Sequence, residues 1–172
     1  MRTMLGGTVL GLALSLSLAL SLVAISPGRA DGQMVRPNPC TLLTADDAQA
    51  VTRTGMAAPQ LANDMTTCTI ASFQAVPTVL TDSAALVTLK VESSRAYDDD
   101  YFSTTTSTKR ALTGLGDEAV TLTDSMPPLL RVRRRWWVYT IRVSAPMTLG
   151  SDAQVLLDTE RRLADRVLSR AP

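Results

Sequence analysis

Two stretches in which apolar and polar residues alternate constrain this sequence more than any other feature. The first is residues 86–92 (LVTLKVE), and the second is residues 129–143, which reads as a hairpin. Alternation with a period of two, rich in β-branched residues, is typical of half-buried antiparallel strands. The apolar positions that share one face are Val87, Leu89 and Val91 in the first stretch, and Trp137, Tyr139, Ile141 and Val143 in the second.

A helical periodicity closes the sequence. Residues 152–169 carry apolar side chains at helical spacing, interrupted by Glu160. Ser151 is placed to cap this helix, and Asp158 and Arg162 are spaced to form an ion pair on its polar side. The apolar positions are Ala153, Leu156, Leu157, Leu163, Ala164, Val167 and Leu168. The pattern predicts an amphipathic helix that lies across the sheet.

Weaker signals add a short helix and two more strands. Thr44 and Asp47 have the spacing of a helix cap and its third residue, and Gly55 is a natural stop for that helix. Residues 68–73 and 119–123 are bounded by turn residues and predict strands.

The remaining segments are assigned from their context. In the strand at 119–123, Val120 and Leu122 are expected to face inward. Residues 95–113 fit either a helix or a loop, and the bend of the hairpin is expected at or near Arg133–Arg135. The sum is an α+β domain: an antiparallel sheet of about five strands, with a short N-terminal helix and a long C-terminal helix packed on it.

Residues 1–30 have the pattern of a secretory signal peptide. Arg2 supplies a basic start, residues 4–25 carry no charge, and the small residues Gly28 and Ala30 stand where a signal peptidase reads. Cleavage is expected after Ala30, which leaves a linker at 31–39 and a single exported domain at 40–172. The predicted location is the cell envelope or the medium.

An uncleaved anchor is the alternative for the same segment, because its apolar run approaches the length that a membrane-spanning helix needs. Contact with a membrane is expected only through such an anchor. Lipidation is disfavoured, since the first cysteine, Cys40, lies well beyond the apolar run. Either fate places the domain outside the cytoplasm.

Cys40 and Cys68 are the two cysteines of the chain. An even count in an exported protein favours a disulfide over free thiols, and the absence of a Cys-x-x-Cys spacing favours a structural bridge over a redox-active pair. On the chain-entropy model, closing this loop stabilises the fold by roughly 3–4 kcal/mol.

Composition excludes several kinds of chemistry. The chain has no histidine, which removes Ser-His-Asp and Cys-His nucleophile systems and most catalytic zinc sites. Seventeen basic residues less Arg2 and Arg29 leave fifteen against sixteen acidic ones, a balance that gives no general attraction to nucleic acid. No cofactor motif is present, and no cofactor is expected.

Two acidic clusters are candidates for a metal-binding or catalytic site. Residues 98–100 (DDD) suggest a Ca²⁺ site, but adjacent side chains cannot all converge on one ion, so a solvated loop or helix start is favoured. Asp117 and Glu118 suggest an acid/base pair, but neighbours on a strand point apart, so a turn with charged flanks is favoured. No catalytic or metal-binding residue is therefore assigned.

The candidate contact surface is the segment RVRRRWW. Arginines beside tryptophans can hold phosphates, stack on bases or lie at a membrane interface. A solvated hairpin whose tryptophans fill the core explains the same residues. The candidates are Arg131, Arg133, Arg134, Arg135, Trp136 and Trp137.

The order of these features resembles a family of small actinobacterial secreted proteins and lipoproteins known as domain of unknown function 3558. The resemblance rests on residues 39–44 (PCTLLT), the second cysteine on the first strand, residues 114–119 (GLGDEA), the hairpin and the final helix. It spans residues 38–170. It implies an α+β domain at the cell envelope and supplies no catalytic residues. The chain departs from the lipoprotein members because it lacks a lipidation cysteine.

Three functions follow from this reading, in decreasing order of preference. The first is a non-catalytic binding or interaction module for an envelope component. The second is a carrier for a small apolar ligand or lipid, held between the sheet and the last helix. The third is an exported hydrolase that uses two carboxylates.

Overall fold

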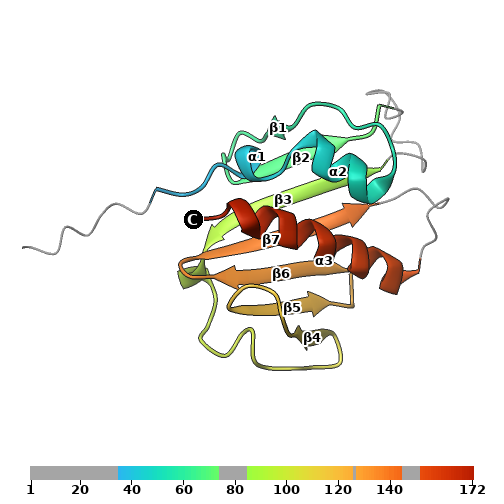
Figure 1. Cartoon of the computed structure of the whole chain (residues 1–172). Helices are drawn as coiled ribbons and strands as arrows, with labels where there is room; N and C mark the ends of the chain where they lie inside the picture. Colours follow the sequence, from blue (N-terminus) through green and yellow to red (C-terminus); the bar gives the residue numbers. More distant parts are fainter. Residues whose placement is uncertain (1–34, 74–84, 126, 145–151) are drawn as a thin grey trace, which may run out of the picture. The chain divides into compact units, whose positions relative to one another are not determined.

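The computed structural model describes residues 35–73, 85–125, 127–144 and 152–172 (Figure 1). Residues 1–34 lie outside this range. The predicted signal peptide, its cleavage after Ala30, the alternative anchor and the first part of the linker therefore lie outside the described residues. So does Ser151, but the prediction that it caps the last helix is wrong, because the side chain of Asp152 caps that helix by accepting from the Gln154 N–H.

Within the described residues, seven strands form one antiparallel sheet in the order β1-β2-β3-β7-β6-β5-β4. They are β1 (Gln60–Leu61), β2 (Thr67–Ala71), β3 (Leu86–Ser93), β4 (Lys109–Leu112), β5 (Glu118–Leu122), β6 (Leu129–Arg134) and β7 (Trp137–Ser144). The α+β class with an antiparallel sheet is confirmed, but the prediction of about five strands is wrong. The two strands that it lacks, β1 and β4, lie at the two edges of the sheet, where no alternation of buried residues marks them.

Three α-helices and one 3₁₀ turn complete the described fold. They are α1 (Pro39–Leu42), α2 (Ala45–Thr52), η1 (Ser94–Ala96) and α3 (Ala153–Arg170). Asn38 caps α1, so the predicted linker gives way to a helix at Pro39. The segment 95–113, left open between helix and loop, contains most of η1, a turn and β4.

The capping box at the start of α2 is confirmed. The Thr44 hydroxyl accepts a hydrogen bond from the Asp47 N–H, and the Asp47 carboxylate accepts one from the Thr44 N–H. The predicted stop at Gly55 is wrong, because the helix ends at Thr52 and Arg53 takes the left-handed conformation at φ 56°.

One face of the sheet carries the main core. Helix α3 lies across β7 and β6, while α1 packs beside β2 and β3 (Figure 1). The predicted inward residues of β3 and β7 lie there with Leu163 and Val167 of α3, and all are buried except Trp137, which is partly buried. Leu130 and Val132 of β6 join them. These side chains fill the space between the sheet and α3 with a single apolar cluster.

The opposite face carries a second, smaller cluster. Val120 and Val138 are buried there beneath Phe102, with Tyr97 and Tyr101 packed at the side. The prediction that Val120 points into the core is therefore corrected: its side chain is buried, but on the face that turns away from α3. Its neighbour Ala119 faces the main core instead.

Glu160 does not interrupt the buried stripe of α3, because it is itself fully buried. Strand β6 pairs with β7 only as far as Ile141, so the N–H of Val143 lies beyond that ladder. It donates to Oε1 of Glu160 at 3.1 Å, while Oε2 has no hydrogen-bond partner. Burial raises the pKa of this carboxyl to about 8, against the opposing effects of the Val143 hydrogen bond and Arg142.

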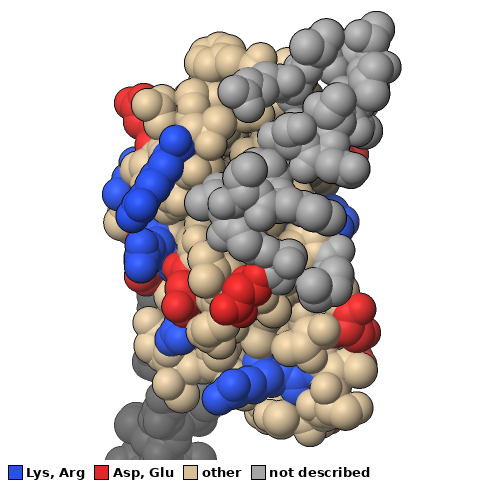
Figure 2. All heavy atoms as spheres, turned by 90° about the vertical axis from the view of Figure 1, so that its right-hand side faces the viewer, with Lys and Arg blue, Asp and Glu red and all other residues tan. Residues whose placement is uncertain are grey.

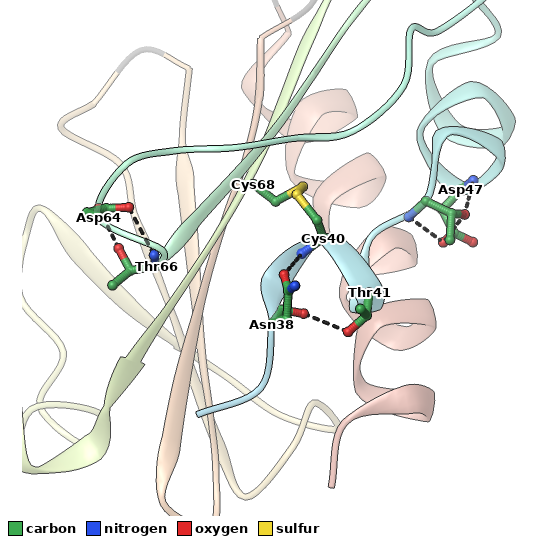
Figure 3. The surroundings of a disulfide bond; sticks show 8 residues. Asn38, Cys40, Thr41, Asp47, Asp64, Thr66 and Cys68 are labelled. Atoms are coloured by element: carbon green, nitrogen blue, oxygen red, sulfur yellow. Dashed lines mark hydrogen bonds between the residues drawn. A yellow bond between two sulfur atoms is a disulfide. The ribbon is translucent and has the colours of Figure 1, made fainter. Parts of the chain in front are cut away.

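The predicted disulfide between Cys40 and Cys68 is confirmed (Figure 3). It ties α1 to β2 across 28 residues of sequence, with the two Cα atoms 5.1 Å apart. Because disulfides persist in oxidising compartments, the bridge favours a location outside the cytoplasm.

A partly buried ion pair joins the end of α3 to the start of α2. The Asp47 carboxylate, whose side chain is 4% exposed, lies 2.5 Å from Nη1 of Arg170 and 3.4 Å from Nη1 of Arg166. Burial alone would raise the pKa of Asp47, but the hydrogen bonds from Arg170 and Thr44 outweigh it and lower the pKa to about 2. The carboxylate therefore stays charged where it joins the two helices.

Candidate functional site

The turn between β6 and β7 is the centre of the candidate surface. Arg134 pairs with Trp137, so Arg135 and Trp136 form a tight loop at one end of the sheet. Arg135 has φ 55°, a left-handed conformation that glycine usually supplies at this position. Such strain in a bulky residue persists only where the surroundings hold it.

Contacts from both sides hold this turn. The N–H of Arg135 donates to the Asp117 carboxylate, and the N–H of Ser94 donates to the carbonyl oxygen of Trp136 at 2.9 Å. Gly116 lies so close to β6 that a Cβ would stand 2.5 Å from the carbonyl oxygen of Arg133. The glycine turn at 114–117 therefore packs against β6 and holds the β6–β7 turn in place.

Four of the six residues of the candidate surface make contacts within the fold. Arg131 donates to the hydroxyl of Tyr101, Arg133 pairs with Glu118, and Arg134 donates to the carbonyl oxygen of Leu168 at the end of α3. The ring of Trp137 packs against the main core. The arginine side chains of β6 thus serve largely to fix the loop at 97–102, β5 and α3 to the sheet.

Arg135 and Trp136 are exposed. The indole of Trp136 is 53% exposed, which is unusual for a large aromatic side chain that costs free energy in water. Met65, in the turn before β2, is 64% exposed and also has a positive φ. It lies towards the same end of the sheet, because β2 begins opposite the last residues of β3. Sequence reasoning missed Met65, which no pattern marks.

The far end of the sheet has a different character. Figure 2 shows that end, where acidic and basic side chains lie interspersed among uncharged ones on the part that can be described. A cavity of about 290 Å³ opens between α2 and α3, lined by Val51, Arg53, Val155, Asp158, Thr159 and Arg162. Asp158 accepts a hydrogen bond from Gln154 there, so the ion pair predicted with Arg162 does not form.

The two acidic clusters predicted as possible sites lie in or beside turns of the fold. Asp117 and Glu118 line a shallow cavity of about 250 Å³ beside Phe102 and Ser103. Asp117 accepts a hydrogen bond from the hairpin turn and Glu118 is paired with Arg133, so both carboxylates have structural partners. The aspartates at 98–100 are exposed, and the backbone carbonyls of Asp98 and Asp100 accept the hydrogen bonds of a turn. Across the described ranges, no three acidic or cysteine side chains gather as metal ligands would.

None of the described helices combines the length and the apolarity that crossing a bilayer requires. Comparison with protein-family models, curated proteins and solved structures gave no match.

Proposed function

We propose that this protein is a non-catalytic binding module of the cell envelope, whose contact surface is the β6–β7 turn. The observation that carries the proposal is the exposed indole of Trp136, held on a strained turn beside the exposed Arg135. Tryptophan and arginine are the residues that most often dominate binding free energy at interfaces. The proposal narrows the six candidates to these two.

The rigidity of the turn supports this role. A binding residue contributes more when its free conformation is already the bound one, because less entropy is lost on association. Here Asp117 and Ser94 fix the turn backbone from two neighbouring segments. The disulfide supports the placement outside the cytoplasm, as does the sequence of the first segment. Membership of the family known as domain of unknown function 3558 is part of the same proposal.

The alternative functions have less support. A carrier needs a long apolar cavity, and the space between α3 and the described part of the sheet is filled by Leu163, Val167 and their partners. A carboxylate hydrolase needs two free acidic groups, and Asp117 and Glu118 are both engaged in holding the hairpin. The side chains of Arg135 and Trp136, by contrast, are exposed.

The test is a comparison of single variants in sedimentation with isolated envelopes of the producing cells. Trp136→Ser is expected to weaken retention by about tenfold or more, since it removes an aromatic anchor. Phe73→Ser is the matched control, because Phe73 is 74% exposed but follows β2 at the other end of the sheet.

A second variant separates binding from folding. Arg135→Gly relieves the positive φ, so its stability is expected to stay equal or to rise by up to about 1 kcal/mol while binding falls. Equal retention of the wild type and Trp136→Ser would refute the assignment of the surface.

A further inference from the structure

The face of the sheet that turns away from α3 is strongly basic. Three basic side chains lie there on adjacent strands: Lys90 on β3, Arg142 on β7 and Arg131 on β6. They surround Thr140, which pairs directly with both Lys90 and Arg131 and stands two residues before Arg142. Burial of Val138 in the second cluster shows that the even-numbered residues of β7 share this face.

The acidic groups near this cluster are already neutralised. The Glu92 carboxylate lies 2.8 Å from Nζ of Lys90 and accepts a hydrogen bond from the hydroxyl of Tyr97 at 3.0 Å. Arg131 and Arg142 form no ion pair with any described residue. Glu92 lies near enough to Arg131, and Glu160 to Arg142, for their charges to interact, but neither arginine is held in an ion pair.

Three donors in this cluster form no hydrogen bond of ordinary geometry. They are Nε of Arg131, Oγ1 of Thr140 and Nε of Arg142, all buried, although the Thr140 hydroxyl lies near that of Tyr97, where it opposes the rise of the Tyr97 pKa. Thr140 as a whole is 9% exposed. Buried donors without partners are uncommon in folded proteins, and each one calls for an unseen acceptor. Here three occur at adjacent positions of one sheet face.

The geometry of the sheet lets these donors converge. Directly opposite residues on antiparallel strands lie about 5 Å apart, and diagonal ones about 7–8 Å apart, which long side chains easily span. The guanidinium of Arg131 lies against the rings of Tyr97 and Tyr101, at 5.5 and 5.6 Å from their centroids, and donates to the Tyr101 hydroxyl. One arginine of the pair is thus already oriented before any ligand binds.

We infer that Arg131, Thr140 and Arg142 form a binding site for a phosphate or sulfate group carried by a small molecule. The three donors match the oxygens of a tetrahedral anion, and the two unpaired arginines match the charge of a dianion. This site lies on the sheet face, apart from the exposed β6–β7 turn, and does not depend on the function proposed for that turn.

The test measures binding of inorganic phosphate and of sulfate to the full chain by equilibrium dialysis at constant ionic strength. The wild type is expected to bind one phosphate per chain at concentrations up to about 10 mM, and sulfate is expected to compete. Arg142→Gln should weaken binding by about tenfold or more. Arg110→Gln is the matched control, because Arg110 is exposed on the edge strand β4.

Two further measurements guard the result. Thr140→Val keeps the shape of the side chain and removes one donor, so it should also weaken phosphate binding and decides the matter if Arg142→Gln does not fold. Trp136→Ser should bind phosphate as the wild type does. No phosphate binding by the wild type, unchanged binding by the folded Arg142 or Thr140 variant, or equal displacement by acetate would overturn the assignment.

Discussion

Replacing Glu160 with glutamine should remove most of the pH dependence of stability above pH 4.5. The carboxyl is fully buried against the end of β7, and its pKa is about 8 in the fold against 4.5 for an ordinary glutamic acid. Because the folded protein holds this proton more tightly than the unfolded chain, folding is favoured below pH 4.5. The advantage is lost as the pH rises towards 8.

The magnitude follows from the two pKa values. Each pH unit between them is worth about 1.4 kcal/mol, so the loss between pH 4.5 and pH 8 is roughly 5 kcal/mol. That is a large part of the 5–15 kcal/mol typical of a domain. Glutamine keeps an oxygen that can accept the Val143 N–H and carries no charge, so Glu160→Gln should be more stable than the wild type at pH 8 by a few kcal/mol.

The assay is urea unfolding at a series of pH values from 4.5 to 9, with the disulfide intact. Asp158→Asn is the control, because Asp158 is an exposed acid on the same helix and should leave the slope of stability against pH unchanged. A wild-type stability that is flat over this range, or a Glu160→Gln variant with the wild-type slope, would refute the reasoning.

Three further perturbations test the framework that holds the turn and the helices. Asp47→Ala should cost about 1–2 kcal/mol in urea unfolding at pH 7, because it breaks a partly buried ion pair and a capping box; a loss below about 0.5 kcal/mol would contradict this. Replacing Cys40 and Cys68 with serine should lower the free energy of unfolding by roughly 3–4 kcal/mol. Reducing the wild type should have the same effect, and equal denaturation midpoints for the oxidised wild type and the serine variant would count against a structural role for the bridge. Gly116→Ala should cost about 3 kcal/mol and Gly114→Ala about 1 kcal/mol, since both have positive φ but a Cβ at position 114 meets open space; equal thermal unfolding midpoints would show that the contact with β6 is unimportant.

The sequence predicts those elements whose pattern arises within one segment. Alternation predicts β3 and β7, and helical spacing predicts α3, because the spacing of apolar residues within each segment shows which face is buried. The capping box of α2 was readable for the same reason. Edge strands β1 and β4 lack a buried face, and they form only because a neighbouring strand offers hydrogen bonds.

The partners of charged side chains could not be predicted in this way. Asp47 meets Arg170 across 123 residues, and Arg134 reaches the end of α3 across 34. Contacts between residues so far apart in the sequence depend on how the helices pack on the sheet, which no local sequence pattern predicts. For that reason the run of basic residues in β6 suggested one surface, whereas the structure distributes it among an aromatic cluster, an ion pair, a helix end and an exposed tip.

Glu160 shows a second limit of the sequence. A charged residue inside an apolar stripe is usually expected to point away from the core. Glu160 is buried here because the pairing of β6 with β7 stops at Ile141, which leaves the N–H of Val143 in need of an acceptor. Knowing this requires the register of two strands, so the sequence alone marked only an interruption.

The most direct test of the proposed contact surface is photo-crosslinking in the producing cells, with a photoreactive amino acid in place of Trp136. A parallel protein carries it in place of Val155, which is 44% exposed on α3. The account predicts a discrete crosslinked product from position 136, recovered with the cell envelope, and none from position 155. No product at position 136, or the same product from both positions, would contradict it.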